Sequence, residues 1–139
     1  MTDALESVTF TIDVLAKPWE RATRDRRTGH HVTRRQTRSF EALVRDTAAL
    51  HIGSAWRLDG VYEMHMVFDL PTYQTRDWDN LGKAISDALN GVAYHDDNQV
   101  MHASVTKRIG KIEPRVSVHL RRIGDWPVKQ RKARRACSR

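Results

Sequence analysis

A dense set of acids, with an amide and a lysine among them, falls within residues 76–99 of the 139-residue chain: Asp77, Asp79, Asn80, Lys83, Asp87, Asp96 and Asp97. Carboxylate oxygens are the ligands that Mg²⁺ prefers, and proteins commonly hold this ion with a few carboxylates, water and substrate. A bound Mg²⁺ neutralises a phosphate oxygen, lowers the pKa of a bound water and stabilises the leaving oxygen. These residue types therefore indicate metal-assisted hydrolysis of a phosphodiester.

The roles divide by residue type. Asp77, Asp79 and Asp97 are suited to hold the metal. Lys83 supplies a positive charge for the scissile phosphate or for orienting the attacking water. The acids of one site must meet in space, and residues 91–96 are long enough to double back along a helix of about 12 residues, which is roughly 18 Å long. The sequence permits this convergence without requiring it.

A helix is predicted from about Asp79 to Asn90, with one of the first two aspartates as its N-cap and Gly91 as a left-handed C-cap. On a helical wheel the polar side chains share one arc, on which Lys83 and Asp87 form an i, i+4 pair. Asp87 can therefore orient Lys83 or a water near the metal. The opposite arc, which we expect to pack on a sheet, is apolar: Leu81, Ala84, Ile85, Ala88 and Leu89.

Other metal and catalytic sites do not match the sequence. An EF-hand loop counted from Asp77 would place Leu81 and Ala88 where oxygen ligands are required. His95 and His102 have no thiol or nearby histidine at zinc spacing. The chain also lacks the Gly-x-Ser-x-Gly elbow of acyl hydrolases and the glycine-rich loops that bind nucleotides.

The elements that must position these acids indicate a small α+β fold. Period-two alternation predicts strands at about 8–14 and 61–68, and residues 100–109 and 115–123 resemble two more strands. Turns are predicted at Asp59-Gly60 and at Gly110, and a second helix runs from about Phe40 to Leu50 with Ser39 as its N-cap. The order β-α-β-α-β-β predicts two layers, a mixed or antiparallel sheet of about four strands with two main helices on one face.

Positive charge is concentrated in two arms. The chain carries 24 Lys and Arg against 17 Asp and Glu, a formal net charge of +7. Arginines suit bidentate contacts to phosphate, and those expected to bind DNA are Arg21, Arg24, Arg26, Arg27, Arg34, Arg35, Arg38 and Arg76. The second arm is a basic tail, residues 127–139, which is expected to be disordered. Residues 1–126 then form one domain, and nucleic acid is its expected partner.

The composition excludes several classes of protein. No apolar stretch approaches the roughly 20 residues that span a bilayer, and no apolar segment like that of a secretory signal follows the N-terminus. Cys137 is the one cysteine, which excludes an intrachain disulfide and cysteine-based zinc sites. We therefore expect a cytoplasmic protein with no membrane partner.

Three motifs in fixed order resemble the signature of the RusA-type Holliday junction resolvases: Asp77-Trp78-Asp79-Asn80-Leu81-Gly82-Lys83, Asp87-Ala88-Leu89-Asn90-Gly91 and Asp96-Asp97-Asn98-Gln99-Val100. The resemblance covers about residues 6–123. It implies a small homodimeric endonuclease, dependent on Mg²⁺ with Mn²⁺ as a substitute, that cuts four-way DNA junctions symmetrically in recombination and repair. Such enzymes are common in phages, prophages and the bacteria that host them.

The resemblance also assigns roles to single residues. Carried over by motif, the metal carboxylates and the catalytic lysine are Asp77, Asp79, Asp97 and Lys83. Residues that match the motif in supporting roles are Asn80, Asp87 and Asp96, the last being the rival of Asp97 for the third acid. A dimer suits paired cuts because two active sites related by a dyad meet opposed strands.

The sequence departs from the family pattern in three places. The segment 17–23 keeps one proline and lacks the asparagine usual in the family's N-terminal loop. Trp78 replaces an aliphatic residue, which we interpret as a packing change, and the basic tail is an addition. Two other functions stay open: a nucleic-acid-binding module without catalysis, and a metal-dependent phosphatase acting on a small phosphate ester.

Overall fold

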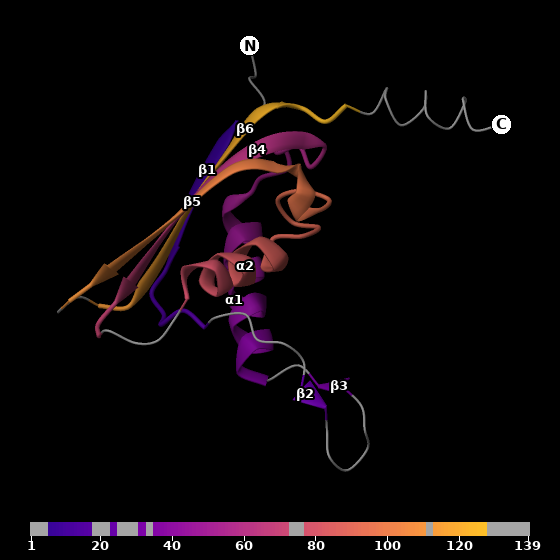
Figure 1. The fold of residues 1–139 in the computed structure, drawn as a ribbon. Coiled ribbons are helices and arrows are strands. Elements are labelled where there is room, and N and C mark those ends of the chain that lie inside the picture. Colours follow the sequence, from indigo (N-terminus) through magenta and orange to yellow (C-terminus); the bar gives the residue numbers. More distant parts are fainter. Residues whose placement is uncertain are drawn as a thin grey trace.

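The computed structural model of the chain describes residues 6–17, 23–24, 31–32, 35–72, 77–110 and 113–127, with the backbone alone for 23–24, 31–32 and 35–37. The elements are β1 (Ser7–Ile12), β2 (Thr23–Arg24), β3 (His31–Val32), α1 (Arg35–His51), β4 (Gly60–Leu70), α2 (Trp78–Ala88), the short 3-10 helix η1 (Asp97–Gln99), β5 (Val100–Ile109) and β6 (Arg115–Asp125). Four strands form one mixed sheet and two helices cover one of its faces, which confirms the predicted α+β class (Figure 1).

The sheet has the strand order β1-β6-β4-β5. The central strand β4 pairs antiparallel with β6 and parallel with β5, and β6 pairs antiparallel with β1. Parallel neighbours need a crossover connection, and α2 provides it between β4 and β5. Both ends of α2 are therefore anchored by the same pair of strands, one of which, β5, is an edge of the sheet.

The core lies between the sheet and the two helices. Alternate residues of the strands face the helices and are buried: Val8, Phe10 and Ile12 on β1, Tyr62, Met64, Met66 and Phe68 on β4, and Val116, Val118 and Leu120 on β6. From α1, Phe40, Val44 and Ala48 enter at helical spacing. The predicted apolar arc of α2 is confirmed, since all five of its members are fully buried: Leu81, Ala84, Ile85, Ala88 and Leu89.

The ends of several elements differ from the prediction. Helix α1 begins at Arg35 rather than at Phe40, so Ser39 lies inside the helix and is not its N-cap. The added turn carries good helix formers without an apolar period, which is why periodicity missed it. Helix α2 ends at Ala88 with Leu89 as its C-cap, and Gly91, with φ of 79°, supplies the left-handed residue two positions later.

The strand pairing could not be predicted from local patterns. The prediction placed a turn at Gly110, and the chain does turn there, but β4 lies between β5 and β6 in the sheet. The basic segment, expected to be irregular, contains the two-residue strands β2 and β3, which pair with each other. Within the described residues, no helix has both the length and the apolar character needed to cross a bilayer.

Candidate active site

The start of α2 presents two aspartates. Asp77 is the N-cap residue, with an extended backbone (φ −70°, ψ 135°), and its side chain makes no capping hydrogen bond. The exposed Asp79 follows in the first turn, where Oδ1 accepts a hydrogen bond of 2.9 Å from the backbone N–H of Asn80. The capping role that would explain an acid here is therefore not filled by the carboxylate of Asp77.

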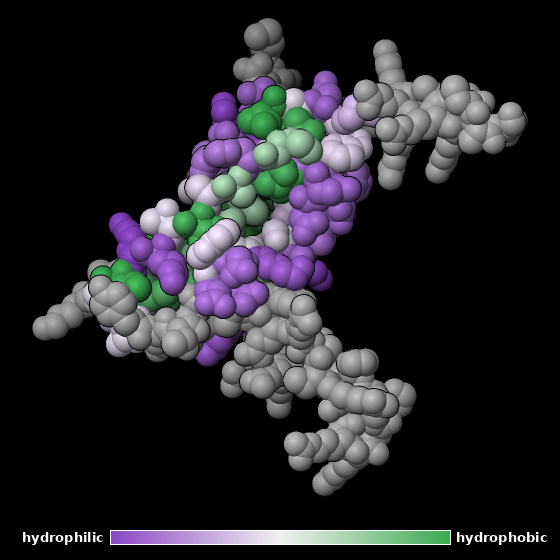
Figure 2. All heavy atoms as spheres, in the orientation of Figure 1, coloured by the Kyte–Doolittle hydropathy of each residue, from purple (hydrophilic) through white to green (hydrophobic). Residues whose placement is uncertain are grey.

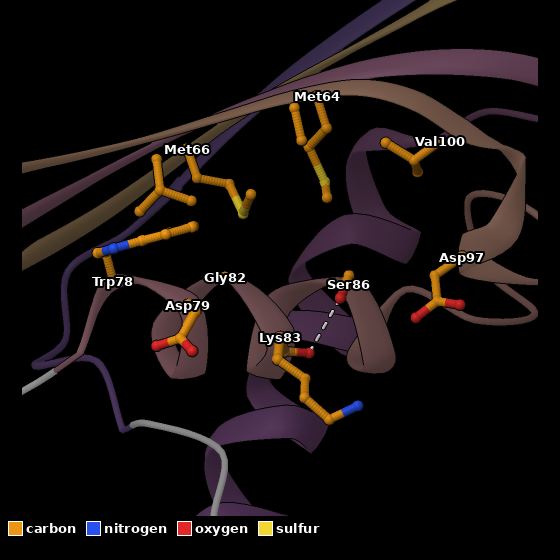
Figure 3. A pocket seen from close by; sticks show the side chains of 11 residues that line it. Met64, Met66, Trp78, Asp79, Gly82, Lys83, Ser86, Asp97 and Val100 are labelled. Atoms are coloured by element: carbon orange, nitrogen blue, oxygen red, sulfur yellow. Dashed lines mark hydrogen bonds between the residues drawn. The ribbon is translucent and has the colours of Figure 1, made fainter.

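A pocket of about 330 Å³ lies between α2 and the β5 edge of the sheet (Figure 3). Its strand side is apolar and consists of Met64, Met66, Val100, Ala103 and Val105. The other lining residues come from α2 and η1 and are mostly polar: Trp78, Asp79, Gly82, Lys83, Ser86 and Asp97. The buried Gly82 sets the close approach of helix to strand, because a Cβ there would lie 3.0 Å from Cγ2 of Val105.

Three of the predicted residues meet at one end of this pocket. Nζ of Lys83 lies 3.3 Å from Oδ2 of Asp87, which confirms the predicted i, i+4 pair. The carboxyl of Asp87 also lies beside that of Asp97, ten positions further along the sequence. Burial raises the pKa of Asp97, and the charges of Asp96 and Asp87 raise it further, while Lys83 opposes the shift.

The structure separates the two acids of the doublet. The carboxylate of Asp96 accepts a hydrogen bond of 3.1 Å from the N–H of Asn98 and so caps η1. The neighbouring Asp97 lines the pocket (Figure 3). Asp97, rather than Asp96, is therefore the acid of the doublet that faces the pocket.

Gln99 holds this turn against the sheet. Its Oε1 accepts a hydrogen bond of 2.9 Å from the N–H of Asp96, which completes a capping box. Its Nε2 donates to the carbonyls of Leu58 and Gly60, at 2.7 and 2.9 Å. Because Gln99 is 3% exposed, these bonds are shielded from water and fix where Asp97 lies relative to β4.

Sequence reasoning missed two residues beside this cluster. Burial raises the pKa of Glu41 on α1, and the charge of Asp87 raises it further, so a carboxyl from the other helix adjoins the site. Tyr94, whose ring is fully buried, donates a hydrogen bond of 2.7 Å to the carbonyl of Ser86. No local pattern could have found Glu41, because only the packing of α1 on α2 brings it there.

The three aspartates assigned to the metal do not share one coordination shell. Asp79 and Asp87 are two helical turns apart, about 12 Å along the helix axis. Asp97 lies beside Asp87, and therefore at the other end of α2 from Asp79. Asp77 lies outside the pocket lining. In the part of the chain that the structure describes, no three acidic, histidine or cysteine side chains are close enough to hold an ion together. The convergence that the sequence permits is thus only partial.

Asp87 and Asp97 fit a divalent cation better than the predicted trio does. Burial and the nearby charges of Asp96 and Asp87 raise the pKa of Asp97, and a divalent cation bound there would offset the repulsion between these carboxylates. Mg²⁺ is often bound through one or two carboxylates together with water and substrate phosphate. Asp97 and Lys83 on the pocket lining, with Asp87 beside both of them, meet that requirement.

Most of the predicted DNA-binding arginines lie outside the described residues, namely Arg21, Arg26, Arg27, Arg34 and Arg76. Arg24 belongs to β2 and Arg35 to the first turn of α1, and for both the backbone alone is described. Arg38 on α1 is exposed. Residues 128–139 of the basic tail also lie outside the described part.

Comparison with known proteins gives one family. No curated protein matches the chain. The family model for the endodeoxyribonuclease RusA matches residues 12–121, which is most of the chain and includes every acid of the site. This range also spans β4, β5, both helices and the first part of β6, whereas β1 lies outside it except for Ile12. The chain belongs to the RusA endodeoxyribonuclease family.

Proposed function

We propose that this protein is a Mg²⁺-dependent endonuclease that resolves four-way DNA junctions by paired, symmetric cuts, acting as a homodimer in DNA recombination and repair. The observation that carries the proposal is the arrangement of Lys83, Asp87 and Asp97 at one end of a pocket in a chain of the RusA family. A phage or prophage origin and an intracellular DNA substrate are consistent with that family.

The metal would be held by Asp97 and Asp87, and the resemblance adds Asp79 and Asp77 as acids needed for cleavage. When bound, Mg²⁺ or its substitute Mn²⁺ would stabilise charge on the phosphate and on the leaving oxygen. Asp79 lines the same pocket from two helical turns away, where it would bind a water or a second ion that neutralises substrate charge. The chain's own residues set these positions through α2 and the Gln99 anchor.

Lys83 is the proposed catalytic lysine. Its ammonium is paired with Asp87 and its side chain is 45% exposed, so a phosphate oxygen can approach it without a buried charge being created. Pairing with Asp87 holds the side chain along α2, and a preoriented cation stabilises developing negative charge better than one on a loose side chain. Asn80 and Asp96 support the site, the first at the start of α2 and the second by capping η1.

The decisive experiment is cleavage of a fixed and a mobile four-way junction, with Mg²⁺ and then with Ca²⁺, mapping the cuts on both strands. We expect two symmetric cuts with Mg²⁺ and binding without cleavage with Ca²⁺. Asp97→Asn and Asp79→Asn should abolish cutting, whereas Asp46→Asn, an exposed aspartate on α1, should cut normally.

Two outcomes would replace the proposal. Tight junction binding with no cleavage under any divalent ion would make the protein a nucleic-acid-binding module. Turnover of a chromogenic phosphate ester, without cleavage of DNA, would make it a phosphatase. Sedimentation of the purified protein tests the homodimer separately, since a monomer that still cuts both strands would contradict the paired geometry.

A further inference from the structure

Trp78 is exposed at the mouth of the pocket. It is 62% exposed, although the sequence suggested that it replaces a packing residue. Figure 3 shows its ring between the start of α2 and the strand that carries Met66. In Figure 2 an apolar band crosses this face of the molecule with polar residues on both sides. A large aromatic ring left open beside an apolar wall indicates a ligand that stacks.

The pocket combines surfaces that few ligands satisfy together. Its strand wall offers methionine, valine and alanine side chains, and its helix wall offers the carboxylates of Asp79 and Asp97. The carboxylates repel a phosphate placed inside the pocket, but they accept hydrogen bonds from amino and imino groups. A volume of about 330 Å³ lies at the small end of the usual range for ligand pockets. A neutral, flat, nitrogen-bearing ring meets all of these conditions.

We infer that the pocket takes one unpaired nucleobase of the DNA substrate, stacked on Trp78, beside the phosphate that is cut. The inference rests on the proposed function, because it uses the same pocket. Every base has a face that can stack on an aromatic ring, and an unpaired base is the easiest to extrude. The backbone of such a nucleotide would pass Lys83, which lines the pocket next to the acids.

The charges of the lining favour a base over a protein segment. An apolar peptide would remove the two carboxylates from water and offer them no hydrogen-bond donors in exchange, which is unfavourable. The amino group of a base can satisfy one of them, and its sugar-phosphate leaves the pocket toward Lys83. A second copy of the chain is the remaining occupant for an exposed apolar groove, and its presence would be seen in the oligomeric state.

The test is junction binding in EDTA, where no cleavage can occur. A fixed four-way junction is compared with eight others, each with an abasic site in place of one of the eight bases at the branch point. Trp78→Ala should weaken binding to the intact junction about 5- to 100-fold, the range expected when the partner of one stacked base is removed. At one of the abasic positions, the wild-type protein should lose affinity by a similar factor. The Trp78→Ala variant should bind that abasic junction as tightly as it binds the intact one.

Control variants separate stacking from other effects. Trp78→Phe keeps an aromatic face and should retain most of the affinity. Met101→Ala removes another exposed apolar side chain, 56% exposed on β5 and outside the pocket, and should change nothing. The inference would be overturned if Trp78→Ala caused no loss of affinity. It would also be overturned if the loss of affinity from Trp78→Ala simply added to the loss from every abasic site. A halved sedimenting mass with Trp78→Ala would also overturn it, because the pocket would then seat a second protomer.

The inference and the proposed function can fail independently. Cleavage of junctions with no coupling between Trp78 and any branch-point base removes the base pocket and leaves the nuclease. Coupling without cleavage under any divalent ion leaves a base pocket in a protein that only binds DNA.

Discussion

Lys83 and Asp87 lie one turn apart on α2 with Nζ 3.3 Å from Oδ2, and the carboxyl of Asp87 also lies beside that of Asp97 from η1. One carboxyl thus joins the lysine of the helix to the acid of the next segment. This relationship places Asp87 between Lys83 and Asp97, whereas the sequence suggested only a supporting role for it. The variants below follow from it and from the contacts around it.

Replacing Lys83 by alanine should slow cleavage far more than it weakens junction binding. The loss of a preoriented cation at the phosphate is expected to cost about 100-fold or more in single-turnover rate. Lys107→Ala, an exposed lysine on β5, is the matched control. Equal losses in rate and affinity would make Lys83 a phosphate anchor and not a catalytic residue.

Asp97→Asn and Asp87→Asn should both remove cleavage and leave junction binding unchanged or tighter, since each removes negative charge near phosphate. The free energy of unfolding should stay the same or rise with Asp97→Asn, because burial, and after it the charges of Asp96 and Asp87, disfavour the charged form of Asp97. The measurements are cleavage, binding in Ca²⁺ and urea denaturation. Either variant cutting at the wild-type rate would exclude that residue from the site.

Gln99→Ala should both destabilise the fold and impair cleavage. It leaves the carbonyls of Leu58 and Gly60 and the N–H of Asp96 without their partner, at a cost of about 2 kcal/mol or more in unfolding free energy. Urea denaturation gives the stability, and cleavage well below the melting temperature gives the rate. Asn98→Ala, an exposed neighbour, should change neither much. A Gln99→Ala protein with unaltered stability would contradict the anchoring role.

The Asp69–Arg108 pair predicts a pH dependence of stability away from the site. Arg108 donates hydrogen bonds of 2.6 and 2.9 Å to the carboxylate and thereby lowers the pKa of Asp69. A pKa lower in the folded than in the unfolded chain stabilises the fold above about pH 4, and this is lost as the pH falls toward the folded-state pKa. Wild type should therefore exceed Asp69→Asn in urea midpoint at neutral pH, and the difference should shrink in acid. A constant difference would exclude the pair as its cause.

Binding to a junction should weaken steeply with salt, with the logarithm of affinity linear in the logarithm of salt concentration. Replacing Arg24, Arg26 and Arg27 by glutamine should lower the slope by about 0.9 for each DNA phosphate that is no longer neutralised. Arg57→Gln removes an exposed arginine that pairs with Asp59, and it serves as the control. If the salt dependence of the triple variant has the same slope as that of the wild type, the first basic arm does not bind the phosphate backbone of the DNA.

Local periodicity explains the parts of the fold that were predicted well. The alternating burial along β4 and the burial of the apolar arc of α2 both agree with the structure. A period of two or of 3.6 residues depends only on residues that are close in sequence, so it can be read without knowing how the rest of the chain folds. The start of α1 was missed because its first turn carries no apolar period.

The amino-acid sequence by itself determined the family, the α+β class and the arc of α2 that carries Lys83 and Asp87. Only the tertiary structure decided that β4 separates β5 from β6, that Asp97 faces the pocket while Asp96 caps a turn, and that Glu41 joins the site. The physical reason is range. Helix and strand periods depend on residues a few positions apart, whereas these outcomes depend on hydrogen bonds and packing between segments far apart in the chain.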